Sequence, residues 1–240
     1  MTVPYRFRGP ADSANGGYMC GLVAGCLEGP VQVTLRRPPP LDTPMTVEQV
    51  DEDAVRIHHD DALVAEAAAV RNGWAPRIPG SVSMTQARAA EGNARYFQDP
   101  AYPACFVCGP DRRPGDGLRI SPGPVNGSSV WAAPWTPTAA DGGRSVSPEV
   151  VWAALDCPGG IAAFEAADIE PDTAILLGRM TAQVTSPPAA GDECQVIAWS
   201  MGRDGRKLTA GSALLAAGGD VLAVATTVWL TVPRQKATGS

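Results

Sequence analysis

The chain has 240 residues and a mass of 24.9 kDa, enough for one large domain or two small ones. Hydrophobic residues make up 45% and charged residues 18%, which excludes an intrinsically disordered chain. The formal net charge of −6 provides no basic surface for a phosphate backbone, so we expect no nucleic-acid partner. No segment reaches the roughly 18 to 20 apolar residues of a membrane helix, and the first residues lack the apolar core of a signal peptide. We therefore expect a cytoplasmic protein that binds no membrane.

The first part of the sequence predicts one helix followed by four strands. Residues 15–27 form the helix, with Asn15 as its N-cap and small or apolar residues on nearly every side, a pattern typical of a buried helix. Short strand-like runs separated by Pro, Asp or Gly follow at Val31–Arg36, Met45–Asp51, Ala54–His58 and Ala62–Val70. Residues 71–104 lose this regularity, apart from a short helix expected over Ser83–Ala94.

The pattern then restarts. A helix is predicted over Pro148–Ala163, with Pro148 in its first turn and Ser147 as N-cap. Strands are predicted before and after it, at Leu118–Ile120, Ser129–Ala133, Ala174–Thr185, Glu193–Met201, Lys207–Ala216 and Val221–Val232. The recurrence of a buried helix and about four strands indicates an internal duplication. We expect an N-terminal half over 1–75, a connecting segment over 76–104 and a C-terminal half over 105–236.

Two short motifs and one acidic residue, Asp156, carry a resemblance to known proteins. Cys105-Phe-Val-Cys108-Gly-Pro, followed by Gly117-Leu118, is similar to the opening of phenylacetate-pathway thioesterases, and Asn15-Gly-Gly-Tyr18 is similar to a helix start in acyl-CoA thioesterases. In that family His-Gly-Gly opens the helix and an acid stands nine residues later. Asp156 matches the acid, whereas Ser147 replaces the histidine and Ala24 stands where the first half would carry an acid. The resemblance implies an α+β double hotdog, in which two tandem repeats each wrap an antiparallel sheet around a central helix.

The resemblance also implies an acyl-CoA thioesterase with one composite site per chain. Asp156 would be the base or nucleophile, and it would face the start of the first helix. There Asn15 and the amides of Gly16 and Gly17 would stabilise the oxyanion. Thr181, and Thr226 or Thr227, would orient water, as threonine does in two-hotdog acyl-CoA thioesterases. Residues expected to bind the acyl group in a tunnel between the helices are Tyr18, Leu22, Trp152 and Phe164, with Ser147 at the second helix start.

The same resemblance implies acyl-CoA or another acyl thioester as partner, no cofactor, and a homo-oligomer built as a dimer of double hotdogs. The structural alternative for Asp156 is a carboxylate in the second half of its helix that bonds to nearby backbone. For Asn15 and the two glycines the alternative is a plain N-cap with tight packing. Arginine pairs at Arg36-Arg37 and Arg112-Arg113 are loop cations of the kind that bind the phosphates of coenzyme A.

Cysteine and histidine patterns give little sign of a metal. The spacing Cys105-x-x-Cys108 suits zinc, but no second CxxC occurs, and the adjacent His58 and His59 point to opposite faces of a strand. The six cysteines are expected to be reduced thiols, with Cys157 a structural one, and we expect no metal.

Two other functions remain open from sequence. A protein that binds an acyl thioester or another small apolar ligand without cleaving it would tolerate the departures at Ser147 and Ala24. An enoyl-thioester hydratase of the hotdog fold would need an Asp and His pair, and both histidines lie on a predicted strand, which counts against it.

Overall fold

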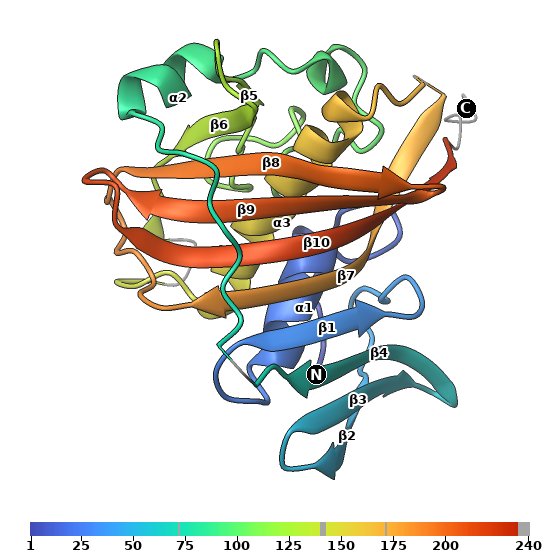
Figure 1. Ribbon diagram of the computed structural model, residues 1–240. Coiled ribbons are helices and arrows are strands. Elements are labelled where there is room, and N and C mark those ends of the chain that lie inside the picture. Colours follow the sequence, from blue (N-terminus) through green and yellow to red (C-terminus); the bar gives the residue numbers. More distant parts are fainter. Residues whose placement is uncertain (72, 140–142, 171, 235–240) are drawn as a thin grey trace.

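The frame of the protein is one antiparallel sheet (Figure 1). The structure, a computed structural model, describes residues 1–71, 73–139, 143–170 and 172–234. Within this part of the chain the sheet has ten strands in the order β2-β3-β4-β1-β7-β10-β9-β8-β6-β5. The strands are β1 (Val31–Leu35), β2 (Thr46–Asp51), β3 (Ala54–His59), β4 (Ala62–Ala69), β5 (Gly123–Pro124), β6 (Val130–Trp135), β7 (Thr173–Val184), β8 (Cys194–Asp204), β9 (Lys207–Ala216) and β10 (Val221–Pro233).

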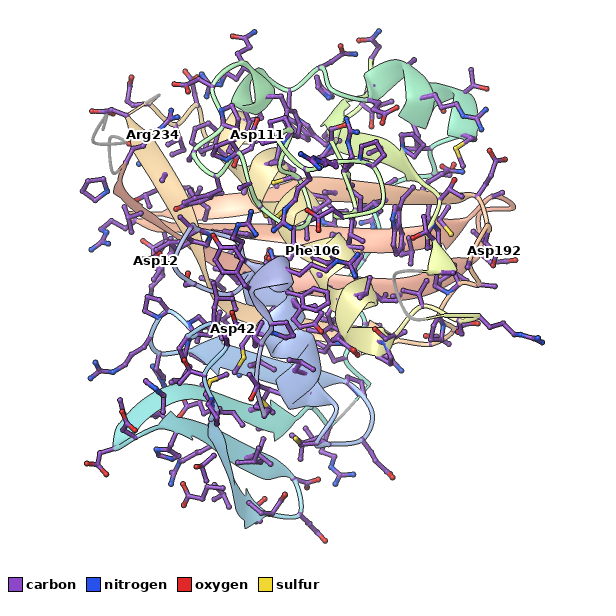
Figure 2. All side chains as sticks on the ribbon, turned by 180° about the vertical axis from the view of Figure 1, so that it is seen from behind. Asp12, Asp42, Phe106, Asp111, Asp192 and Arg234 are labelled. Carbon is purple, nitrogen blue, oxygen red and sulfur yellow. The ribbon has the colours of Figure 1, made fainter. Side chains whose placement is uncertain are left out.

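Two helices, α1 (Gly16–Ala24) and α3 (Pro148–Ala166), lie together on one face of the sheet, as Figure 2 shows from behind. Helix α3 is buried continuously from Val150 to Phe164, because the sheet wraps one side of it and α1 covers another. A third helix, α2 (Met84–Ala90), packs at the β6 end of the sheet. No helix in the described ranges is long and apolar enough to cross a membrane.

Helices α1 and α3 run antiparallel and touch through two glycines of α1. A Cβ atom at Gly17 would lie 2.8 Å from the carbonyl oxygen of Trp152, and one at Gly21 would lie 2.5 Å from Cα of Glu149. Any larger residue at either position would therefore push the helices apart. This contact leaves no room for the expected acyl tunnel between the helices at these two glycines.

The sheet continues from the first half of the chain to the second without a break. Strand β1, which follows α1, pairs with β7, which follows α3, and Gln32 lies opposite Thr181. The chain from Gly73 to Ser83 crosses the face of the sheet that lies opposite α1 and α3 on its way to α2 (Figure 1). The expected limit of the second half at 236 lies outside the described residues.

Most predicted elements are present with shifted ends, and one prediction was wrong. The helices predicted at 15–27, Ser83–Ala94 and Pro148–Ala163 correspond to α1, α2 and α3. The segment Leu118–Ile120 is not a strand of the sheet. The backbone N–H groups of Leu118 and Ile120 instead donate to the carbonyls of Phe106 and Val107, and Arg119 has a φ of 54°. These apolar residues are buried against a loop, which the alternating pattern does not distinguish from a sheet.

Candidate functional site

Asp156 of α3 lies at the first turn of α1. Its Oδ2 atom accepts a hydrogen bond from the backbone N–H of Gly17 at 2.9 Å and one from Nδ2 of Asn15 at 3.0 Å. The Oδ1 atom has no hydrogen-bond partner among the described residues, although the side chain is 1% exposed. One carboxylate oxygen is thus held by two donors, and the other is buried without a protein partner among the described residues.

The start of α1 is formed by a cap that works with Asp156. Asn15 accepts a hydrogen bond from the backbone N–H of Tyr18 through Oδ1 while its amide nitrogen donates to Asp156. The backbone N–H of Gly16 has no partner among the described residues. A Cβ atom at Gly16 would lie 2.8 Å from Leu177 of β7, so a glycine is needed for this close approach. The helix dipole makes this end of α1 favourable for negative charge.

A cavity of about 180 Å³ opens beside this carboxylate. Asn15, Gly16 and Asp156 form part of its wall, together with the thiols Cys105 and Cys157. The rest of the wall is mainly apolar and comes from β1, β7, β10 and the loop after β1, including Leu35, Pro39, Ile175, Leu177, Trp229 and Leu230. A concave apolar site with a few converging polar groups is the usual form of a small-molecule site.

The environment of Asp156 favours its protonated form more than water does. Burial raises the pKa of Asp156 to about 7, and the charge of Cys105 acts in the same direction. The hydrogen bonds from the Gly17 N–H and the Asn15 amide act in the opposite direction and lower the pKa. A carboxyl group with a pKa near neutrality is suited to take a proton from water. The site therefore has the groups for base-assisted attack on a carbonyl, including the Gly16 N–H, which no residue in the described part of the chain engages.

The structure brings together four of the predicted catalytic residues: Asn15, Gly16, Gly17 and Asp156. Gly17 differs from the expectation in one respect, because its N–H is already bonded to Asp156 and is not free for an oxyanion. The structural alternative for Asp156 is also partly met, since the carboxylate does bond to backbone, but to that of the other helix.

Thr181 and Thr226 are not brought to this site. They lie opposite each other on β7 and β10, and both line a hollow under Trp74 and Pro76 of the segment that crosses the outer face. Successive side chains of a strand point to opposite faces, and Thr227, next to Thr226, is the one near α3. Thr181 and Thr226 therefore point away from Asp156, whereas Thr227, the alternative to Thr226, lies on the face turned towards α3.

The predicted acyl-binding residues do not line the cavity either. The Tyr18 ring stacks on Phe7 with the centroids 3.9 Å apart and lies edge-on to Phe106, which Figure 2 places beside one end of α1. Trp152 is buried at the contact between the helices. Phe164 packs on Tyr96 near the C-terminal end of α3. Leu22 is half-buried against the core, and Ser147 is half-buried at the start of α3.

Sequence reasoning missed part of the cavity wall. Cys157 was expected to be only structural, yet its Sγ lies 3.6 Å from that of Cys105, and both residues line the cavity. The position of Cys157 next to Asp156 in the sequence could have indicated that it lies in the site. Its contact with Cys105 could not be predicted, because the two residues are 52 positions apart in the sequence. Of the predicted arginine pairs, Arg36 and Arg37 are exposed and line the cavity, whereas Arg112 is buried and donates to the carbonyls of Ala104 and Arg6.

No protein-family model matches the sequence, and no curated protein matches it. Solved structures do match, at low identity. The tesB protein of Mycobacterium avium subsp. paratuberculosis superposes with a TM-score of 0.58 at 14% identity, covering 97% of this chain and 91% of that one. The acyl-CoA thioesterase II TesB2 of Mycobacterium marinum gives 0.56 at 11% identity, with 92% and 91% covered. A hot dog fold protein of unknown function from Alicyclobacillus acidocaldarius gives 0.55 at 12% identity, with 96% and 91% covered.

These similarities extend over most of the chain and concern its fold. Together with the antiparallel sheet and the helices on its inner face, they show that the protein has a hotdog-type α+β fold, as the sequence motifs predicted.

Proposed function

We propose that the protein is an acyl-CoA thioesterase in which Asp156 is the base or nucleophile. The observation that carries this proposal is the Asp156 carboxylate in the cavity wall, where Gly17 and Asn15 hold Oδ2 and no described residue bonds to Oδ1. The carboxylate either activates water or attacks the thioester carbonyl, and the Gly16 N–H stabilises the negative oxygen that results. The names of the similar structures support the same activity.

The volume of the cavity favours a short acyl group. A volume of about 180 Å³ is smaller than the roughly 300 Å³ at which sites for drug-sized ligands begin. Its apolar wall would surround the acyl chain, and the exposed Arg37 at its edge would meet the phosphates of coenzyme A. Arg36 is engaged with Glu66, so Arg37 is the better candidate for this contact.

The test is thiol release from short, medium, long and aromatic acyl-CoAs by the wild type and its Asp156→Asn variant. The variant removes the base, so we expect kcat to fall at least about 100-fold. Asp192→Asn is the matched control, because Asp192 is exposed and lies far from Phe106 in Figure 2. Unchanged hydrolysis by Asp156→Asn would refute the site. Saturable binding without turnover by the wild type would favour a non-catalytic binding protein instead.

Arg37→Gln tests the head-group contact separately. Because an exposed phosphate contact acts on binding and not on the chemical step, we expect KM for acyl-CoA to rise several-fold with kcat unchanged. The same substitution should leave KM unchanged for an acyl thioester that lacks the nucleotide. An equal effect on both substrates would remove Arg37 from the head-group site.

We further propose that the chain is a double hotdog, with halves over 1–75 and 105–236 joined by 76–104. The strand order supports this proposal. In the first half, β1 follows α1 and lies beside β4, the last strand of that half. In the second half, β7 follows α3 and lies beside β10, the last strand there.

We also propose a dimer of such chains. Edge strand β2 is exposed along its whole length and carries Val47 and Val50, which favours a covering partner. Sedimentation equilibrium would distinguish a dimer from a monomer.

A further inference from the structure

Three cysteine thiols from distant parts of the sequence meet beside the cavity. Cys105 and Cys108 come from the loop before β5, and Cys157 comes from α3. Their Sγ atoms all lie within 4.8 Å of one another, and those of Cys105 and Cys157 are 3.6 Å apart. All three residues are buried, so the cluster is shielded from bulk water.

The loop that carries two of these thiols is held in one conformation. A Cβ atom at Gly109 would lie 2.5 Å from the backbone N and O of Cys105, so only glycine lets the chain fold back this closely. The Gly109 N–H donates to the Cys105 carbonyl at 2.9 Å, and the buried Arg112 donates to the Ala104 carbonyl at 2.8 Å. The thiols of Cys105 and Cys108 are therefore positioned by a tight turn that these hydrogen bonds hold.

Hydrogen-bond donors converge on the sulfur atoms. Asn15 Nδ2 lies 3.9 Å from Sγ of Cys105 and 3.8 Å from Sγ of Cys157, within hydrogen-bond range for sulfur. Outer hydrogen-bond donors of this kind orient the ligands of metal sites.

We propose that Cys105, Cys108 and Cys157 bind one thiophilic divalent cation of the Zn²⁺ class. Zinc–sulfur bonds of about 2.3 Å in a tetrahedron place the sulfur atoms roughly 3.8 Å apart, close to the 3.6 Å between Cys105 and Cys157 and within the 4.8 Å that bounds all three pairs. Cys105 and Cys157 also line the cavity, so the cation would lie beside it. Bound there, the cation fixes the loop with Cys105 and Cys108 to α3, next to Asp156. This inference goes beyond the proposed hydrolysis and does not depend on it.

The test is a titration of the reduced, metal-stripped full chain with Co²⁺, which reports thiolate ligation by its absorption. We expect one Co²⁺ per chain, with tetrahedral d–d bands and a sulfur-to-cobalt charge-transfer band, both removed by added Zn²⁺. Cys108→Ser should weaken binding at least about tenfold, since even supporting contacts of a metal ligand cost that much. Cys26→Ser is the control and should bind as the wild type does, because Cys26 is exposed and outside the cluster.

A reduced wild type that gives no charge-transfer band would overturn the site, as would a folded Cys108→Ser variant with wild-type affinity. Circular dichroism shows whether that variant is folded, and the wild-type titration decides the question if it is not. Cobalt binding is measured without substrate, so an inactive protein that binds one Co²⁺ would support this site while refuting the proposed hydrolysis.

Discussion

The two helices on the inner face of the sheet begin in different ways. Helix α1 begins at Asn15-Gly16-Gly17. There the Asn15 side chain caps the helix, and Asp156 accepts a hydrogen bond from the backbone N–H of Gly17. Helix α3 begins at Ser147-Pro148, where proline has no N–H and the Ser147 side chain makes no capping bond among the described residues. Ala24 takes the place in α1 that Asp156 takes in α3. The start of α1 thus combines backbone donors, a carboxylate from the other helix and a cavity, whereas the start of α3 lacks this combination among the described residues.

The largest effect is expected when a carboxylate is placed at the equivalent position of α1. Ala24 is 8% exposed, so Ala24→Asp would bury a charge without the pair of donors that Asp156 has. We expect the free energy of unfolding to fall by about 3 kcal/mol or more. Urea denaturation measures this loss, and Ala24→Asn separates the effect of charge from that of size. Wild-type stability of Ala24→Asp would mean that the α3 start does supply donors.

The next effect concerns the close contact at the start of α1. Gly17→Ala would place a Cβ against Asp156 and 2.8 Å from the Trp152 carbonyl oxygen, forcing the helices apart. We expect a loss of about 2 to 3 kcal/mol in unfolding free energy, together with reduced hydrolysis. Gly25→Ala is the matched control at the other end of α1. Its nearest contact would be an ordinary 3.4 Å and its φ is −62°, so stability should be unchanged or slightly higher. Equal stability of the two variants would contradict the packing described here.

A smaller difference is expected between the two N-cap residues. Asn15→Ala removes both the cap of α1 and a donor to a buried carboxylate, at a cost of about 2 kcal/mol. Ser147→Ala removes no capping bond and should change stability by less than about 0.5 kcal/mol. Chemical denaturation of both variants makes the comparison. A cost for Ser147→Ala as large as that for Asn15→Ala would show that the two starts are energetically alike.

The smallest effect is expected on the outer face of the sheet. Thr226 lies there, away from Asp156, so Thr226→Val should change kcat by less than about twofold. The measurement is thiol release from the best acyl-CoA substrate. A loss comparable to that of Asp156→Asn would restore the role predicted for this threonine from the family resemblance.

Local patterns in the sequence were enough for most of the secondary structure. Alternating apolar residues separated by Gly, Pro and Asp predicted the strands of both halves, and Asn15 before a run of small residues predicted the start of α1. The hotdog-type fold followed from short motifs around Asn15, Cys105 and Asp156. Such patterns succeed because they reflect local backbone preference and burial on one face.

Tertiary structure decided which side chains meet. The sequence alone cannot tell which face of β7 and β10 is turned towards the helices at Thr181 and Thr226, because a shift of one residue reverses every side chain of a strand. It also cannot place Cys157 against Cys105, since that contact depends on how α3 packs against a loop 52 residues earlier. The sequence by itself determined most of the elements and the hotdog-type fold class, and it singled out Asp156. The cavity, the Asp156 oxygen to which no described residue bonds and the three-thiol cluster arise only from packing between distant segments.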